Sequence, residues 1–190
     1  MNEARPSSPY DSPIWRRFHR AESPDGRYTA QIDPAHEVSM GNPTSGVLCL
    51  SNGLHLLRCN PSFVWSDDSR YLAVPQFFQY LGVFARQRLL IVAMEKRTVY
   101  ASRRTAYYFQ PDTFHSGDLR VTIDPSERAE VVMFHLPADI ASKFQPVPAP
   151  WPEAASTPQN EDDDPEVGKQ LGSRDPAAFA EEIHDCSRTH

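Results

Sequence analysis

The chain has 190 residues with a net charge of −6, and its 18 prolines outnumber its 8 glycines. This length suits one domain with tails, and the composition excludes a collagen or a coiled coil. The longest apolar run, Leu89–Met94, is far shorter than the roughly 20 residues that a membrane-spanning helix needs.

Acidic residues are concentrated at the end of the chain. Residues 151–190 hold 10 acidic and 3 basic side chains, whereas residues 1–150 hold 15 acidic and 16 basic ones. A near-neutral body lacks the positive field typical of a nucleic-acid-binding protein. The start of the sequence has no apolar signal segment, and three cysteines (Cys49, Cys59 and Cys186) fit a reducing compartment better than a disulfide scaffold. We therefore expect a cytoplasmic protein that is not inserted in a membrane.

Four segments follow one another along the chain. Residues 1–14 are polar and rich in proline and serine, which predicts a flexible N-terminal segment. Residues 15–145 contain short apolar or alternating runs between turn residues, which predict a β-repeat domain. Residues 146–174 are expected to form a proline-rich acidic linker, and residues 175–190 either a short helix capped by Asp175 or a disordered tail.

About ten strands are expected in the β-repeat domain, because the runs are short and regularly spaced. This texture predicts an all-β fold with two or three stacked antiparallel sheets, not alternating strands and helices. The expected strands are Arg27–Asp33, Gly46–Leu50, Leu54–Cys59, Phe63–Trp65, Tyr71–Val74, Leu89–Met94, Thr98–Ser102, Ala106–Phe109, Leu119–Ile123 and Glu130–Leu136.

Two hairpin turns are expected inside this domain. Asn52-Gly53 lies between apolar runs and favours a two-residue type I′ turn, in which both residues have positive φ. This turn pairs Cys49 with Leu56, so Cys49 and Cys59 are out of register and no disulfide between them is expected. The second hairpin is expected to turn at residues 95–97.

A short motif occurs twice, 43 residues apart. The segment Ser23–Ala30 aligns with Ser66–Ala73, and each copy has a polar turn, then Arg-Tyr, then a strand. Serine and aspartate side chains accept hydrogen bonds from backbone N–H groups two residues on and close such turns. A third, degenerate copy is expected at His115–Thr122. The residues assigned to the structural turns are Ser23, Asp25, Gly26, Ser66, Asp67 and Asp68.

The repeated motif resembles the WD40-like, TolB-type β-propeller repeat, whose blades carry Trp-Ser and then a Ser-Pro-Asp-Gly turn before a strand. The resemblance covers residues 15–135, and Asp68-Ser69 stands where Asp-Gly is usual. A closed ring takes about 4–8 blades, and the chain has room for about three of about 43 residues. The resemblance therefore implies an open or partial propeller, sandwich-like in its packing, or a ring completed by oligomers or a partner. It also implies a rigid scaffold whose faces bind other molecules.

The sequence contains no recognised catalytic or metal-binding motif. The candidates for a loop-borne acidic site are Asp67, Asp68, Asp112 and His115. The acid pair in one tight turn lacks the number of ligands that a metal ion requires. We therefore expect no catalytic residues, no metal and no cofactor, with a small enzyme or enzyme-accessory domain as an alternative.

An aromatic and basic stretch follows the second copy of the motif. Between Pro75 and Phe84, four aromatic residues either close the core or form an exposed anchor for a partner. The basic residues after them predict solvated strand faces, contact with an acidic protein or the chain's own acidic tail, or nucleic-acid binding through residues 86–108. The candidate partner-binding residues are Phe77, Phe78, Tyr80, Phe84, Arg86, Arg88, Tyr107 and Tyr108.

These observations favour a non-catalytic protein-binding module. By analogy with bacterial immunity proteins, we expect it to block a cognate toxin or enzyme stoichiometrically, and an acidic surface would complement a basic toxin such as a nuclease. The partner is expected to be another protein, with nucleic acid as the lesser alternative. We expect the chain to be a monomer or a small oligomer.

Overall fold

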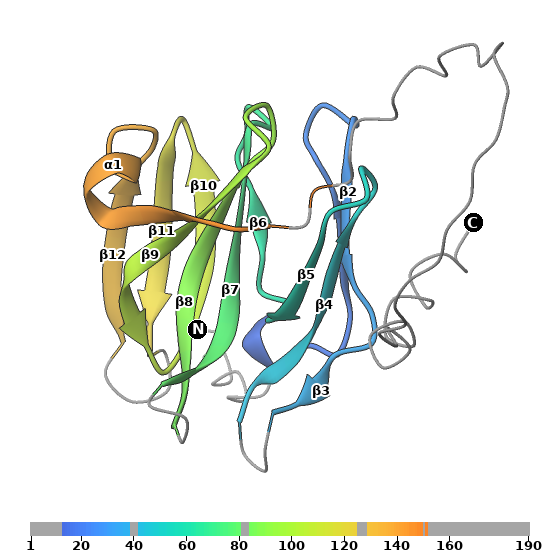
Figure 1. Cartoon of the computed structure of the whole chain (residues 1–190), viewed down its shortest axis with the longest axis vertical. Helices are drawn as coiled ribbons and strands as arrows, with labels where there is room; N and C mark the ends of the chain where they lie inside the picture. Colours follow the sequence, from blue (N-terminus) through green and yellow to red (C-terminus); the bar gives the residue numbers. More distant parts are fainter. Residues whose placement is uncertain (1–12, 39–41, 81–83, 125–128, 150, 152–190) are drawn as a thin grey trace, which may run out of the picture. The chain divides into compact units, whose positions relative to one another are not determined.

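The computed structural model describes residues 13–38, 42–80, 84–124, 129–149 and 151, and gives only the backbone of residues 79, 80, 84 and 85. The prediction of an all-β fold is confirmed, because the described residues form two antiparallel sheets, of ten and three strands, and one short α-helix (Figure 1). That helix has four residues, and within the described chain no helix has the length and apolar character to span a bilayer.

Thirteen strands and two short helical segments follow one another in the described chain. The strands are β1 His19–Glu22, β2 Thr29–Ile32, β3 His36–Glu37, β4 Thr44–Leu50, β5 His55–Cys59, β6 Val64–Trp65, β7 Tyr71–Tyr80, β8 Phe84–Ala93, β9 Thr98–Ala106, β10 Phe109–His115, β11 Asp118–Ile123, β12 Glu130–His135 and β13 Phe144–Val147. The helical segments are the 3-10 helix η2 Pro13–Trp15 and the α-helix α1 Ile140–Lys143.

The ten-stranded sheet contains two four-stranded meanders that follow the same plan. Strands β1, β2, β4 and β5 form the first meander, and β6, β7, β8 and β9 form the second. Glu22 pairs with Thr29 in the first and Trp65 pairs with Leu72 in the second, so the same pairing recurs 43 residues later. Strand β5 pairs with β7 to join the meanders, and β13 adds a strand beside β9. The sequence repeat is thus also a repeat of register in the first two strands of each meander. The next pairing differs, because Ala30 pairs with Leu50 whereas Ala73 pairs with Ile91 and not with Ala93.

The expected third copy of the motif contains a different kind of turn. His115 pairs with Asp118 across the hairpin of β10 and β11, and Ser116 and Gly117 between them both have positive φ. Such a two-residue turn is of the primed type that suits a twisted hairpin. The unit built on it has three strands, after which the chain runs through α1 to β13 and the ten-stranded sheet.

The β7–β8 hairpin lies between the first meander and the three-stranded sheet (Figure 1), and its part formed by residues 71–74 and 89–93 is buried on both faces. Leu90 and Val92 pack in a hydrophobic cluster with β2, β4 and β5, whereas Leu89 and Ile91 pack in a second cluster with β10, β11 and β12. Successive side chains of a strand point to opposite faces, so two buried faces require a continuous apolar run. The run Leu89–Met94 meets this requirement.

The turn at Asn52-Gly53 differs from the prediction. Of these two residues only Gly53 has positive φ (85°), and Asn52 Oδ1 accepts a hydrogen bond from the Leu54 N–H at 3.2 Å. The loop therefore follows the three-residue form with glycine in the left-handed position, and the register shifts so that Cys49 pairs with His55. Cys59 is a free, buried thiol and forms no disulfide with Cys49.

The aromatic segment Pro75–Phe84 is part of the sheet and not an insertion between strands. Strands β7 and β8 pair continuously from Tyr71–Ala93 to Tyr80–Phe84. The sequence predicts that the strand ends at Val74, because Pro75 lacks a backbone N–H donor and proline is rare inside sheets. The next hairpin turns where it is predicted, since the residues on either side of Met94–Arg97 pair with each other.

The ends of the β-repeat domain differ from the predicted limits. Ile14 is buried, and its carbonyl oxygen accepts a hydrogen bond from Asn60 Nδ2 at 2.8 Å, so the domain begins inside the segment 1–14. Strand β13 continues beyond residue 145, where Pro146 pairs with Tyr100. Most of the expected linker and the whole segment 175–190 lie outside the described residues.

Candidate functional site

The two copies of the repeated motif form the same hydrogen-bonded turn. The serine hydroxyl donates to the aspartate two residues later, from Ser23 to Asp25 and from Ser66 to Asp68, at 2.7 Å in both. The same hydroxyl accepts the backbone N–H of the tyrosine five residues later, at 3.0 and 2.9 Å. Each aspartate also accepts hydrogen bonds from the backbone N–H and the Nε of the arginine two residues after it.

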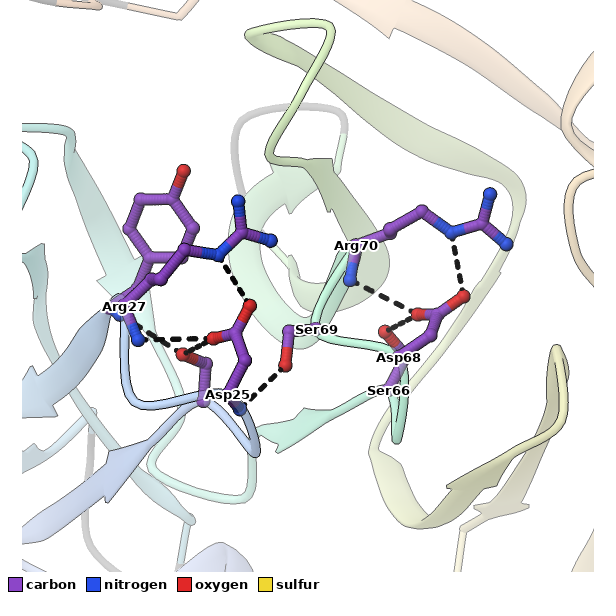
Figure 2. A network of polar contacts seen from close by, with 8 residues as sticks. Asp25, Arg27, Ser66, Asp68, Ser69 and Arg70 are labelled. Atoms are coloured by element: carbon purple, nitrogen blue, oxygen red, sulfur yellow. Dashed lines mark hydrogen bonds and ion pairs between the residues drawn. The ribbon is translucent and has the colours of Figure 1, made fainter.

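These two turns lie side by side and are joined directly (Figure 2). The Asp25 backbone N–H donates to the Ser69 hydroxyl at 3.0 Å, and Trp65 Nε1 donates to the carbonyl oxygen of Ala21 at 3.2 Å. Ser69 stands where the first turn has Gly26, and both residues have positive φ, 61° and 72°. A glycine at residue 69 would relieve the backbone strain, but only the serine supplies the hydroxyl that joins the turns.

The turn of the three-stranded sheet adjoins the second copy. Asp67 Oδ2 accepts the backbone N–H of Ser116 at 2.9 Å and lies 2.7 Å from His115 Nδ1. The Asp67 backbone N–H donates to the carbonyl oxygen of Phe114 at 3.2 Å. Turns from three parts of the sequence therefore form a row, which we call the turn row (residues 23–28, 66–71 and 115–118).

The candidate acidic residues are not gathered at one place. Asp67 and His115 meet in the turn row, and Asp68 forms an ion pair with the arginine of its own turn. Asp112 lies on β10 and accepts a hydrogen bond from Thr122 at 2.7 Å. In the part of the chain that the structure describes, no three His, Cys, Asp or Glu side chains are placed to hold a metal ion. These contacts tie the carboxylates to the turns and strands of the fold.

Acid is expected to weaken the turn row. The hydrogen bonds from Ser23 and from the Arg27 N–H hold the pKa of Asp25 well below its usual range. Burial raises the pKa of Asp68, but hydrogen bonds from Ser66 and from the following arginine outweigh burial and leave it lowered. Depressed carboxyl pKa values stabilise the folded state above the unfolded pKa of about 4, and this contribution is lost as the pH falls through the folded pKa.

The measurement is urea unfolding of the protein and its Asp25→Asn/Asp68→Asn variant from about pH 7 down to about pH 2. The variant should be less stable at neutral pH, and the difference between the two proteins should shrink below about pH 4. Two parallel stability curves across this range would show that the turn carboxylates are not responsible.

Other candidate residues gather on one face of β7 and β8, beside Tyr107, which directly follows β9. Phe78 pairs with Arg86 across β7 and β8, and the Arg86 guanidinium lies 3.7 Å from the centre of the Tyr107 ring. The Arg88 guanidinium lies 5.9 Å from the centre of the Phe78 ring and donates to Gln76 Oε1 at 2.9 and 2.7 Å. We call Phe78, Arg86, Arg88 and Tyr107 the arginine–aromatic face.

The arginine–aromatic face is partly exposed and positively charged, since Phe78, Arg86 and Arg88 are half-buried. Tyr107 is 53% exposed, and Leu57 on the neighbouring β5 is 40% exposed. Among the described residues, no carboxylate forms an ion pair with Arg86 or Arg88. A guanidinium stacked on an aromatic ring keeps its N–H edge available for a carboxylate or a phosphate.

The remaining candidates do not belong to this face. Phe77 is 6% exposed and points away from Phe78, so it belongs to the core. Tyr108 donates through its hydroxyl to Asn42 Oδ1 at 2.8 Å, which ties it to the segment before β4. Tyr80 and Phe84 pair through their backbones, and their side chains lie outside the described atoms.

The basic residues expected for nucleic-acid binding do not form a continuous track. Lys96 and Arg97 lie in the turn between β8 and β9. Arg86 is near the other end of β8, about 23 Å from that turn at the usual rise of a strand. Arg104 is engaged by Glu130, with 3.0 Å between Nη1 and Oε1. The charge of the segment is thus divided between separate places.

No protein-family model, curated protein or solved structure matches the chain.

The arginine–aromatic face is not part of the internal repeat. The residues 43 positions before Phe78 and Arg86 are Ala35 and Pro43, which are of a different type. Gln76 accepts the hydrogen bonds that position Arg88, and no sequence motif indicates this role. Its contacts to β5 and β8 join residues 19 and 12 positions apart.

Proposed function

We propose that the protein is a non-catalytic binding module that holds an acidic surface of another protein on its arginine–aromatic face. The observation that carries this proposal is the stacking of Arg86 on Tyr107 beside Phe78. Arginine and aromatic side chains are the types that contribute most energy at protein interfaces. Because this face carries two guanidinium groups, a carboxylate-rich partner complements it best.

The scaffold that we propose is an open, partial propeller with two four-stranded blades and a three-stranded third unit. The register shared by the first two strands of each meander and the repeated Ser–Asp turns support this interpretation. The adjoining part of the β7–β8 hairpin, which is buried on both faces, would hold the arginine–aromatic face rigid. A site on rigid strands loses little conformational entropy when it binds.

The action that we propose is stoichiometric blockade of a cognate toxin or enzyme, as in an immunity-type protein. The engagement of the described candidate acids in turn and strand contacts supports a binding role over a catalytic one. A basic partner would have to use the acidic surplus of residues 151–190, whereas the arginine–aromatic face selects an acidic one.

Reversing one charge on the face should strongly weaken partner capture. The immobilised full chain is exposed to a lysate of its source organism, and equimolar bound proteins are identified by mass spectrometry. Arg86→Glu should reduce capture of such a partner about tenfold or more, the equivalent of about 1.4 kcal/mol. Arg20→Glu on β1 makes the same charge change on an exposed strand at the far edge of the sheet and should leave capture intact.

Circular dichroism of both variants confirms that they fold before the comparison is made. Equal capture by Arg86→Glu and Arg20→Glu would exclude the arginine–aromatic face as the binding surface. Retention of nucleic acid in place of protein, lost in Arg86→Glu, would instead favour the nucleic-acid alternative.

A further inference from the structure

Apart from the two-residue strands β3 and β6, four strands form the outer edges of the two sheets, and three of the four carry features that block pairing with another chain. Strand β1 is short and charged, β13 contains Pro146, and β10 contains Pro111 beside a shift of register. Charge, proline and irregular register are the usual protections of an edge strand. Strand β12 has neither a proline nor a register shift, and all six of its residues pair in sequence with β11.

The outer side of β12 is also where the third unit lacks a strand. The two meanders have four strands each, whereas the third unit ends at β12 and the chain leaves through α1 (Figure 1). In the described ranges β12 pairs with β11 alone. Asp139 engages both backbone groups of His135 at 2.8 Å, so the outward N–H and C=O groups without a partner strand belong to the residues before His135. This edge therefore has the geometry to accept one more strand.

The exposed side chains of β12 are apolar. Val131 is 51% exposed and Met133 is 40% exposed, and they point to the same face because they are two residues apart. The charged ends of the strand are engaged within the chain. Glu130 Oε1 lies 3.0 Å from Arg104 Nη1, and His135 Nδ1 lies 2.7 Å from a carboxylate oxygen of Asp118.

The sequence of β12 is complementary to itself. When two copies pair antiparallel about Val132, each Val131 lies opposite the partner's Met133, on one face of the joined sheet. Each Glu130 then lies opposite the partner's Phe134, so no like charges face each other. A twofold interface requires such self-complementarity, because the same residues form both of its sides.

We propose that the occupant of this edge is the β12 strand of a second copy of the chain. The two three-stranded sheets then form one continuous antiparallel sheet across a twofold axis at Val132, and the exposed apolar pair of each copy is covered by that of the other. This dimer uses no residue of the arginine–aromatic face, and the inference does not depend on the proposed function.

Disulfide cross-linking tests the register of the proposed pair. Val132→Cys places a thiol opposite its own copy, so mild oxidation of the full chain should give a covalent dimer. In Val131→Cys the two thiols would belong to residues more than about 7 Å apart, beyond the reach of a disulfide. Oxidation of the unsubstituted chain reports any dimer made by its own cysteines. Cross-linking of Val131→Cys as readily as Val132→Cys, or of neither, would overturn the proposal.

Sedimentation velocity over a concentration series tests the same interface without oxidation. Met133→Lys should raise the dimer dissociation constant tenfold or more, because it places a charge in the apolar pair. Leu57→Lys is the matched control, since Leu57 on β5 is also 40% exposed, and it should leave the dimer unchanged. A chain that is monomeric at every concentration, or an equal effect of the two variants, would overturn the proposal.

Discussion

Alanine at either Leu90 or Ile91 is expected to destabilise the protein by about 2–5 kcal/mol, the usual cost of truncating a large side chain in a packed core. The two residues are neighbours on β8, so their side chains point to opposite faces of the sheet. Both are buried nonetheless, at 1% and 0% exposed. Leu90 packs with the first meander and Ile91 packs with the three-stranded sheet, so each substitution opens a cavity in a different cluster.

The free energy of unfolding of each variant is measured by urea denaturation. Leu57→Ala is the control, because Leu57 lies on a strand but is 40% exposed, and its loss should cost well under about 1 kcal/mol. A large effect at only one of the two β8 positions would mean that the other face of the hairpin is open to solvent, which the structure does not allow.

Gly117→Ala should be the more damaging of two matched turn substitutions. Gly117 has a φ of +82°, and a Cβ added there would lie 2.6 Å from the carbonyl oxygen of Leu136. Left-handed strain together with a clash against backbone should cost about 2–4 kcal/mol. Gly26 has a similar φ of +72°, but nothing lies within 4 Å of its added Cβ. Gly26→Ala should therefore cost only the strain, about 1–2 kcal/mol.

Thermal and urea unfolding of these two variants separate strain from steric contact. The difference between them measures how closely the β10–β11 turn approaches the end of β12, since the backbone conformations of the two glycines are alike. Equal losses of stability would show that the carbonyl oxygen of Leu136 moves away without cost.

Local chemistry made the repeated turns predictable. The Ser–Asp pairs of Ser23–Ala30 and Ser66–Ala73 act within six residues, so their hydrogen bonds follow from spacing alone. Most strand positions follow from the same kind of local pattern, because a run such as Leu89–Met94 is long enough to bury two faces. The turn at Asn52-Gly53 shows the limit, since the choice between two- and three-residue loops depends on the register of the flanking strands.

The candidate site was less predictable, because it is made by contacts between distant residues. The stacking of Arg86 on Tyr107 depends on how β8 pairs with β9, and that pairing contains a register shift. The contact of Asp67 with His115 joins two sheets, and no spacing in the sequence indicates it. The sequence does not show which aromatic residues of 75–84 belong to the core and which to the surface. That assignment depends on the continuation of β7 through Pro75.

The central claim, that the arginine–aromatic face is the binding surface, is tested most directly by calorimetric titration of the purified partner into the intact protein. One partner should bind per chain, and Arg86→Glu and Tyr107→Ala should each weaken the dissociation constant about tenfold or more, while Arg20→Glu should not change it. An unchanged affinity in both Arg86→Glu and Tyr107→Ala would contradict the claim and place the binding surface elsewhere on the molecule.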